Sequence, residues 1–344
     1  AIQLLLKLNA AAMATRGVSF VNSSMLWASE QKFLVTSEGS RIEQYAIRAS
    51  PGFTVTAVDG QTGDFQTRTS FAGPQTVGYE FMEAYPWLAE AQQAGEEAVQ
   101  KLKGRPVAAG TYDLVLDPSH LWLTIHESIG HSTELDRALG WEANYAGTSF
   151  LTPESVGKVR IGSPIVNFVA DRTQATGLAT VGYDDEGVAG QRWHLVKDGL
   201  FVDWQTTREL APLVGQQKSH GCLHSDNWSS VPFPRMPNVS LEPAATEVTL
   251  DQLFSEIKRG LFVVGRGVSS IDQQRYNFQF GGAVIREIRD GKVGAMVKDA
   301  AYQTPTPDSW ASCDGVGGPT TYKLWGTSAD GKGEPGQTNA VSHG

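Results

Sequence analysis

Hydrophobic residues recur at three- and four-residue spacing in two stretches of the chain, and this spacing is typical of amphipathic helices. In residues 86–104, PWLAEAQQAGEEAVQKLKG, a proline stands near the start and a glycine at the end, which predicts one helix. The first 17 residues, AIQLLLKLNAAAMATRG, predict another. Because Lys7 and Asn9 interrupt its apolar run and no basic segment precedes it, we interpret it as a helix entered midway rather than a secretory signal.

Alternating apolar and polar residues predict strands in much of the remaining chain. From residue 17 to about Tyr79, stretches rich in Val, Phe, Thr and Tyr are interrupted by Asn-Ser, Ser-Glu and Glu-Gly pairs, which predicts antiparallel strands with short turns. Residues 110–118, GTYDLVLDP, predict a buried strand, and Ser119 is the expected N-cap of the helix that follows. From about Ser163 onward, short β-branched runs alternate with Gly, Pro and Asp, which favours a closed or strongly curved sheet.

Three local signals refine the second half of the chain. Asp-Gly pairs at 198–199 and 290–291 stand between strand-like segments and predict tight hairpins. Residues 251–260, DQLFSEIKRG, predict one short helix that ends at Gly260.

These elements predict an α+β fold built from two domains. We expect an N-terminal α/β domain at residues 1–108, truncated at its start, and a β-rich, barrel-like C-terminal domain at residues 109–344. A length of 344 residues suits two domains. We also expect both ends of the chain to be trimmed from a longer protein.

Composition narrows the range of partners. The formal net charge is -9 and no run of Lys and Arg is present, which argues against nucleic acid as a partner. The two cysteines, Cys222 and Cys313, cannot build a disulfide framework, so we expect a reducing compartment, the cytoplasm. No apolar run approaches the ~18 residues that a bilayer-spanning helix needs, so we expect no membrane association.

The segment LTIHESIGHSTELD, residues 123–136, carries the strongest chemical signal. His126 and His131 are five residues apart, so on an ideal helix their side chains would diverge by about 140°. A single π-turn absorbs one extra residue, and Gly130 tolerates such a distortion. We therefore predict that both histidines bind one metal ion, with Glu127 beside it as a general base. The alternative is a surface helix whose charged side chains only form caps and salt bridges.

Longer stretches around these histidines resemble a known family. HESIGHSTELDRALGWEANYAGTSF is similar to the core motif of the TldD/PmbA metallopeptidases, which carry H-E-x-x-x-H. GYDDEG (182–187), RMPNVSLEP (235–243) and GKGEPGQ (331–337) resemble further family segments in the family order. The resemblance covers most of the chain and is strongest to the TldD side of the family.

The resemblance implies a zinc peptidase that cleaves unfolded or small peptides. It implies that His126 and His131 are metal ligands and that Glu127 is the catalytic base. It also implies a dimer, either of two identical chains or with a metal-free TldE/PmbA-like subunit. The C-terminal domain would then hold the metal.

The expected third ligand departs from the family pattern. The family has a cysteine just before the GK of its Gly-rich segment, whereas this chain has Asp330 there. Two histidines and one aspartate can bind zinc, and the same set also suits non-haem iron. Cys313 is the alternative ligand if the alignment slips. Glu134 is expected to support a ligand rather than to bind metal.

Several other polar residues have both a structural and a functional interpretation. The acidic run of GYDDEG is either a solvated turn or a loop near the substrate channel. Arg235 and Asn238 either bind the peptide or fix their own loop, and the second is favoured. His220, Cys222 and His224 are spaced two apart, which is unusual for a closed zinc site.

Three functions remain open from the sequence. The leading one is a TldD-like peptidase. The second is a metal-poor, non-catalytic partner or scaffold that has lost its metal because Asp330 stands in place of the family's cysteine. The third is a biosynthetic metalloenzyme acting on a natural-product intermediate. Metal content separates the second from the other two.

Overall fold

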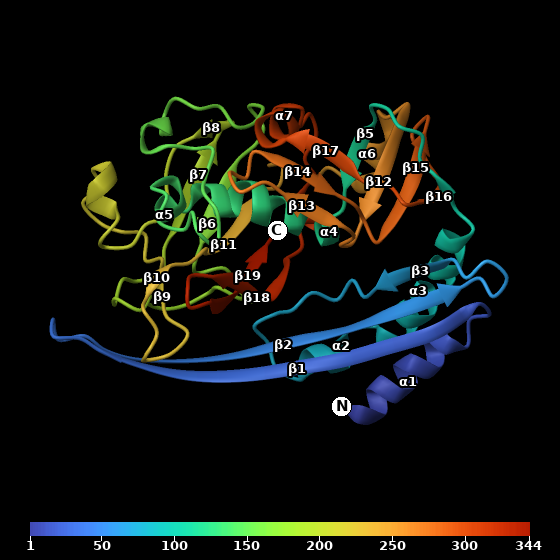
Figure 1. Ribbon diagram of the computed structural model, residues 1–344, viewed down its shortest axis with the longest axis horizontal. Coiled ribbons are helices and arrows are strands. Elements are labelled where there is room, and N and C mark those ends of the chain that lie inside the picture. The colour runs from blue at the N-terminus through green and yellow to red at the C-terminus, as the bar shows by residue number, and fades with distance from the viewer.

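A three-stranded antiparallel sheet with two packed helices forms the N-terminal part of the computed structural model, which describes all 344 residues (Figure 1). Across the sheet the strands are β1 (Val18–Val35), β2 (Arg41–Val58) and β3 (Phe65–Thr69). The two packed helices are α1 (Ile2–Met13) and α3 (Trp87–Leu102), and a shorter helix, α2 (Glu80–Ala84), precedes α3. Helices α1 and α3 contact each other and the sheet, where Phe53, Val55 and Ala57 alternate inward from β2.

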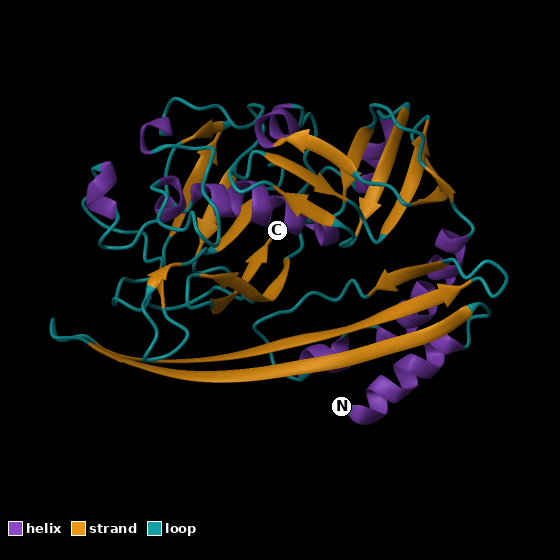
Figure 2. Ribbon diagram, in the orientation of Figure 1, coloured by secondary structure: helices purple, strands orange, loops and turns teal.

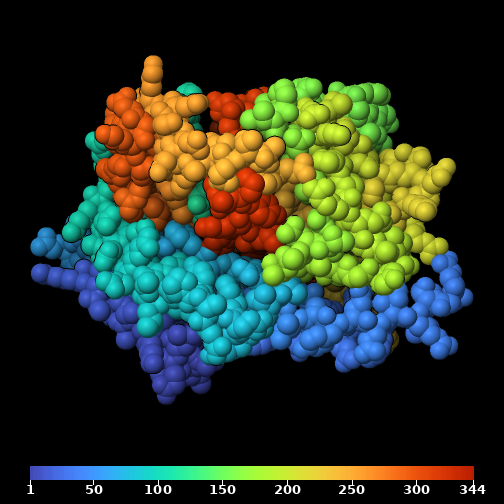
Figure 3. All heavy atoms as spheres, turned by 180° about the vertical axis from the view of Figure 1, so that it is seen from behind, coloured from blue at the N-terminus to red at the C-terminus, as the bar shows by residue number.

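Both helices predicted in this part are confirmed, but the expected short strands are not. Strands β1 and β2 pair over almost their whole length, and Asn22-Ser23 lies inside β1. The chain turns only at residues 36–40, around Glu38 and Gly39. Because each polar residue of one strand faces a partner on the other, the ribbon continues through residues that would end a shorter strand. The ribbon extends beyond the rest of the molecule, which is clearest in the space-filling view (Figure 3).

The rest of the chain holds four further sheets, shown as orange strands in Figure 2. A six-stranded sheet has the order β18 (Trp325–Lys332), β19 (Gln337–His343), β11 (Asn238–Leu241), β6 (Phe168–Asp171), β7 (Arg192–Lys197), β8 (Leu200–Phe201). A five-stranded sheet has the order β4 (Arg105–Pro106), β16 (Lys292–Lys298), β15 (Val284–Arg289), β12 (Arg259–Val264), β5 (Asp113–Leu116). The small sheets are β13 (Ser269–Ile271), β14 (Asn277–Phe280), β17 (Tyr302–Pro305), and β9 (Leu223–His224) with β10 (Phe233–Pro234).

The fold is therefore mixed α/β with a β-rich C-terminal part, as predicted. None of the four sheets closes on itself, so barrel-like describes this part only loosely. Both predicted hairpins are present, and their Asp-Gly pairs join β7 to β8 and β15 to β16. Asp198 and Asp290 have positive φ, which fits tight turns of this kind.

The remaining helices are short, and one prediction about them is wrong. They are α4 (Pro118–Ile125), α5 (Leu135–Ala138), α6 (Leu250–Ser255) and α7 (Thr306–Ala311). Helix α6 ends well before Gly260, which lies in β12 instead. A Cβ at Gly260 would lie 2.6 Å from the carbonyl oxygen of Asp113, so the glycine permits the close approach of parallel strand β5.

The larger hydrophobic core lies between α4, the turns that follow it and the six-stranded sheet. Ile125 and Ile129 point into it beside Phe168 and Trp204, and all four side chains are buried. This packing fixes the backbone on both sides of His126. No helix combines the length and the hydrophobicity required to cross a bilayer.

Candidate metal centre

Helix α4 begins with an aspartate rather than with the predicted serine. Asp117 is in extended conformation, and its carboxylate accepts a hydrogen bond from Ser119 N–H at 2.9 Å. Pro118 occupies the first helical turn, where its missing N–H costs nothing. Ser119 is therefore inside the helix, and its Oγ accepts from Gly265 N–H.

A π-turn follows α4 and confirms the predicted bulge. Residues His126–Gly130 form one turn of π-helix, in which His131 N–H donates to His126 C=O five residues earlier. A Cβ at Gly130 would lie 2.4 Å from Met236 Sδ, so this position needs glycine for packing. Five residues now complete about one turn, and the two histidines return to the same side of the helix.

Hydroxyl groups satisfy the carbonyls that the distortion loosens. Ser128, Ser132 and Thr133 each donate to the carbonyl oxygen four residues earlier. Gln205 Nε2 donates to Gly130 C=O. The polar residues within and just after the histidine motif thus hold the irregular turn in place.

Three side chains converge on one point. Asp330, near the end of β18, places Oδ1 3.4 Å from His126 Nε2 and 3.7 Å from His131 Nε2. One donor atom from each residue lies within 4.8 Å of the others, so the group could hold a metal ion. All three side chains are more than nine-tenths buried.

A third histidine orients the first. His343 Nδ1 lies 2.9 Å from the carbonyl oxygen of Val239, so it carries the proton and leaves Nε2 as an acceptor. His126 Nδ1 lies 2.9 Å from that Nε2 and donates to it. In the neutral imidazole Nε2 is then the unprotonated nitrogen, and it is directed toward Asp330.

Glu134 does the same for His131. Its Oε2 lies 2.8 Å from His131 Nδ1 and 2.6 Å from Arg137 Nε. When Nδ1 is protonated and donates to Glu134, Arg137 Nη2, 2.9 Å away, forms no hydrogen bond to it. In this tautomer His131 Nε2 is the nitrogen left to bind a metal, and Glu134 supports a histidine, as expected.

Arg235 holds the aspartate in place. Its Nη2 donates to Asp330 Oδ2 at 2.7 Å and also to the carbonyl oxygen of Asp330. Asp330 Oδ1 is thereby left facing the histidines. The sequence predicts that Arg235 fixes its own loop. Its role is structural, as favoured, but it fixes the strand that bears Asp330. Asn238 bonds to Asp171 C=O and Ala179 N–H, which is structural.

The protonation states of His126, His131 and Asp330 depend on one another. Burial would raise the pKa of Asp330, but His126, His131 and Arg235 outweigh it and hold that pKa far below its usual range. Burial would lower the pKa of His126, but Asp330 raises it overall. Asp330 is therefore an anion at neutral pH and supplies a carboxylate oxygen to any ion bound there.

Buried charged side chains hold Glu134, the partner of His131, in place. Lys332 Nζ lies 2.9 Å from Glu134 Oε1 and 2.8 Å from Asp136 Oδ2, and its side chain is fully buried. Burial would raise the pKa of Glu134, but Arg137 and Lys332 outweigh it and lower that pKa. Two anions and two cations are thus enclosed together beside His131.

Glu127 directly follows His126 and is more exposed than the three residues of the centre. Its side chain is 22% exposed, against 9% or less for the three donor residues. Arg275 Nη1 is 3.6 Å from its Oε2. Cys313, the alternative ligand, is not in the group, and its Sγ instead donates to Gly315 C=O.

His220, Cys222 and His224 do not form a metal site. His220 bonds to Asp203 and stacks on Trp193, and Cys222 is buried in the core. These residues are structural.

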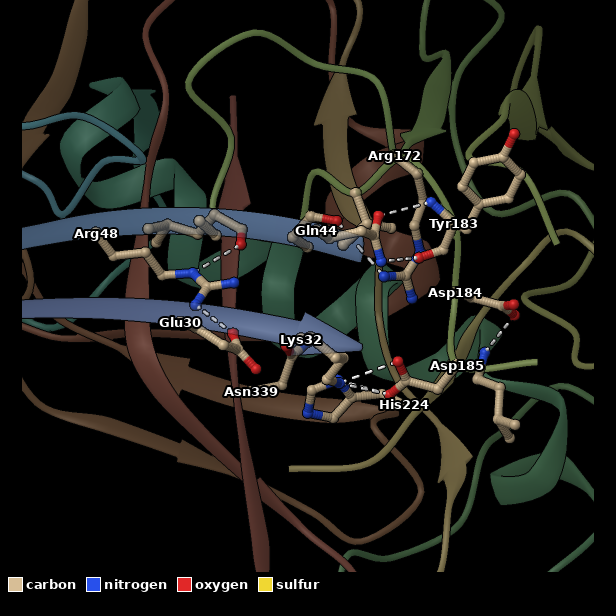
Figure 4. Close-up of a pocket in the computed structure, with 15 residues that line it drawn as sticks. Glu30, Lys32, Gln44, Arg48, Arg172, Tyr183, Asp184, Asp185, His224 and Asn339 are labelled. Carbon is tan, nitrogen blue, oxygen red and sulfur yellow. Dashed lines mark hydrogen bonds and ion pairs between the residues drawn. The ribbon is translucent and has the colours of Figure 1, made fainter. Parts of the chain in front are cut away.

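The acidic GYDDEG run holds the long ribbon against the body. Asp185 forms an ion pair with Lys32 of β1 at 2.8 Å, and Asp184 accepts from Leu223 N–H (Figure 4). Asp184 also accepts from two backbone N–H groups of its own loop. The recess between ribbon and loop has a volume of about 50 Å³, and Figure 4 shows two ion pairs in it, Lys32–Asp185 and Arg48–Glu30. The run is therefore a turn that holds the ribbon, but it is not solvated, because Asp184 is buried. Its position near a substrate channel stays a prediction.

The site residues missed from the sequence include Arg137 and Lys332 beside Glu134, and also His343 and Arg275. His343 reaches His126 because β19 lies parallel to β11, and nothing in AVSHG indicates such pairing. Arg275 follows Asp272 in IDQQRYN, a turn-like stretch with no recognisable motif. Only knowledge of the strand order could have placed His343 or Arg275.

Comparisons with known proteins agree with this architecture. Residues 1–105 match the PmbA/TldA metallopeptidase central domain, and residues 109–339 match the PmbA/TldA metallopeptidase C-terminal domain. A metalloprotease from Methanothermobacter thermautotrophicus is 30% identical over 306 residues, which are 89% of this chain and 64% of that protein. A zinc metalloprotease TldD homologue from Saccharolobus solfataricus is 28% identical over 48% of this chain and 35% of its own length.

A solved structure supports the fold. TldE from Thermococcus kodakarensis superimposes with a TM-score of 0.66 at 18% identity, over 100% of this chain and 74% of its own. The two metalloproteases are longer than this chain, which spans less than two thirds of their length. Since the two domain matches together cover nearly every residue, the chain belongs to the PmbA/TldD metallopeptidase family.

Proposed function

We propose that this chain is a zinc-dependent peptidase of TldD type that hydrolyses peptide bonds in unfolded or small peptides. The observation that carries the proposal is the π-turn, which brings His126 and His131 together with Asp330, while Glu127 beside them is partly exposed. The relatives named metalloprotease and zinc metalloprotease support it.

The donor atoms fit zinc. Both histidines offer Nε2 because His343 and Glu134 accept their Nδ1 protons, and Asp330 offers one carboxylate oxygen. Three protein ligands with an open fourth position are the usual pattern of a catalytic zinc site. Bound there, zinc would polarise the peptide carbonyl and lower the pKa of a water molecule. The same donor set also accepts iron, so metal identity is part of the test.

The chain's own residues would carry the proton transfers. Glu127, partly exposed beside the donors, takes a proton from the attacking water and later passes it to the leaving amine. His343 and Glu134 keep the two imidazoles in the required tautomer throughout. The extended substrate adds as a strand to a free sheet edge in the β-rich part, which would give little sequence selectivity.

One observation favours a second candidate, a metal-poor partner subunit. Asp330 Oδ2 is already bound by Arg235, whose side chain is fully buried. A buried cation that shares the carboxylate with a metal ion weakens that ion's binding by charge repulsion. The similarity to TldE supports a subunit role beside another chain of this family, either a second copy or a TldE-like one.

Removing and restoring the metal tests the proposal. We expect roughly one zinc per chain in the purified protein, measured by elemental mass spectrometry. Cleavage of a reduced, alkylated and therefore unfolded protein should stop after chelation and return with added zinc. No zinc in the wild type, but zinc in Asp330→Cys, would favour the metal-poor partner instead.

Replacing His343 should weaken zinc binding without removing a donor atom. We expect His343→Ala to raise the zinc Kd about 10–100-fold, because His126 loses the acceptor that fixes its tautomer. Competition with a coloured chelator measures this Kd. His194→Ala is the matched control, since His194 contacts only Glu242 at the surface and should leave the Kd unchanged. An unchanged Kd in His343→Ala would show that His126 does not depend on this bond.

A further inference from the structure

Arg275 supplies the only ion pair of Glu127. It lies in the turn between β13 and β14, far from Glu127 in sequence, with Nη1 3.6 Å from Oε2. Its side chain is 14% exposed and that of Glu127 is 22% exposed, so both are more accessible to a ligand than His126, His131 and Asp330. A distance of 3.6 Å is too long for a hydrogen bond, so the two groups are close but not locked together.

The backbone of Arg275 adopts an unfavourable conformation. Its φ is +63°, in the left-handed region that residues with a Cβ avoid. In the two predicted hairpins the same region is taken by aspartate, a residue that tolerates it far better. The turn itself therefore does not explain why an arginine stands here.

The surroundings hold this conformation firmly. Arg275 N–H donates to Asp272 C=O, and Thr306 Oγ1 donates to Arg275 C=O at 2.7 Å. On the other side of the turn, Thr148 N–H donates to Gln273 C=O at 2.8 Å. The guanidinium is thus delivered to one place from a fixed backbone.

Most of its hydrogen-bonding capacity is unused. Nη2 donates to Ala146 C=O at 2.7 Å, while Nε is buried and has no partner. A guanidinium has five N–H donors in a planar fork that suits oxygen anions. Nη1 is not among the buried atoms and forms no hydrogen bond, so an oxygen atom supplied by a ligand would complete this group.

We propose that Arg275 binds the carbonyl oxygen of the peptide bond that is cleaved and stabilises its negative charge during attack. The inference rests on the proposed peptidase function and adds a residue to it. Water forms the new C–O bond and loses a proton to Glu127, while the π electrons of the carbonyl move to its oxygen. Arg275 donates hydrogen bonds to that oxygen; the C–N bond then breaks and the proton of Glu127 passes to the leaving amine.

Glycine at position 275 separates this role from a structural one. We expect Arg275→Gly to lower kcat for peptide cleavage about 10²–10³-fold with little change in KM or zinc content. Its melting temperature should stay the same or rise, because glycine relieves the positive φ. Millimolar guanidinium chloride, below the denaturing range, should restore part of the rate, and Arg275→Lys should keep part of it.

A control variant and the pattern of results separate a failure of the Arg275 role from a failure of the proposed function. Arg289→Met alters an exposed arginine on the β15–β16 hairpin and should behave as wild type. If the wild type cleaves the peptide and Arg275→Gly has the same kcat, only the role of Arg275 is overturned. A lower melting temperature with no rescue by guanidinium would show that Arg275 merely anchors its turn. A zinc-loaded wild type that cleaves no unfolded peptide would overturn the proposed function and this inference together.

Discussion

Replacing Glu127 by glutamine is expected to lower kcat for peptide cleavage by about 10²–10⁴-fold, the range that general acid–base catalysis contributes. Glutamine keeps the size of the side chain but cannot accept the proton of the attacking water. Zinc content should not change, because the three donor atoms belong to His126, His131 and Asp330. Steady-state cleavage of an unfolded protein and elemental mass spectrometry measure the two quantities.

Two comparisons make the Glu127 result specific. Glu154→Gln alters a carboxylate on the surface and should leave kcat unchanged. If Glu127→Gln retained near wild-type activity with full zinc, another group would have to be the base. Loss of zinc in this variant would instead mean that Glu127 is itself a ligand.

Replacing Lys332 by methionine is expected to cost about 3–5 kcal/mol of unfolding free energy, because it leaves buried anions without one of their cations. Lys332 contacts Glu134 and Asp136, and all three side chains are almost fully buried. Methionine retains the apolar stem, so the loss would come from charge rather than from packing. Urea unfolding of the zinc-free protein measures the change.

An exposed ion pair provides the control for Lys332. Arg105 pairs with Glu287 at 3.1 Å, but its side chain is 67% exposed. Arg105→Met should therefore change the unfolding free energy by only about 0–1 kcal/mol. If Lys332→Met cost no more than this, Arg137 alone would be sufficient to balance Glu134 and Asp136.

The sequence predicts the centre well where its residues are close together. His126, Glu127 and His131 lie within six residues, and the need for a π-turn follows from their spacing alone. Asp330 is 199 residues from His131, so no local pattern links the two. Only the resemblance to the family identifies Asp330 as a candidate ligand. Its place beside the histidines depends on strand β18, which no local pattern positions.

The fold was predictable in class but not in strand order. Periodicity identified helix α3 and the two Asp-Gly hairpins, because local spacing and turn chemistry determine them. It misplaced the end of helix α6, since the glycine there serves packing between β5 and β12 rather than the helix end. The division at residue 108 stays a prediction.

The distance in sequence between the donors has a consequence for biosynthesis. A ribosome that adds about 5–20 residues per second makes Asp330 some 10–40 s after His131. Throughout that interval the nascent chain carries two histidines with neither the carboxylate nor the supporting His343. A metal ion captured then would be held by only two ligands and would exchange readily, so stable metal binding at the proposed site would require strands β18 and β19 to have docked.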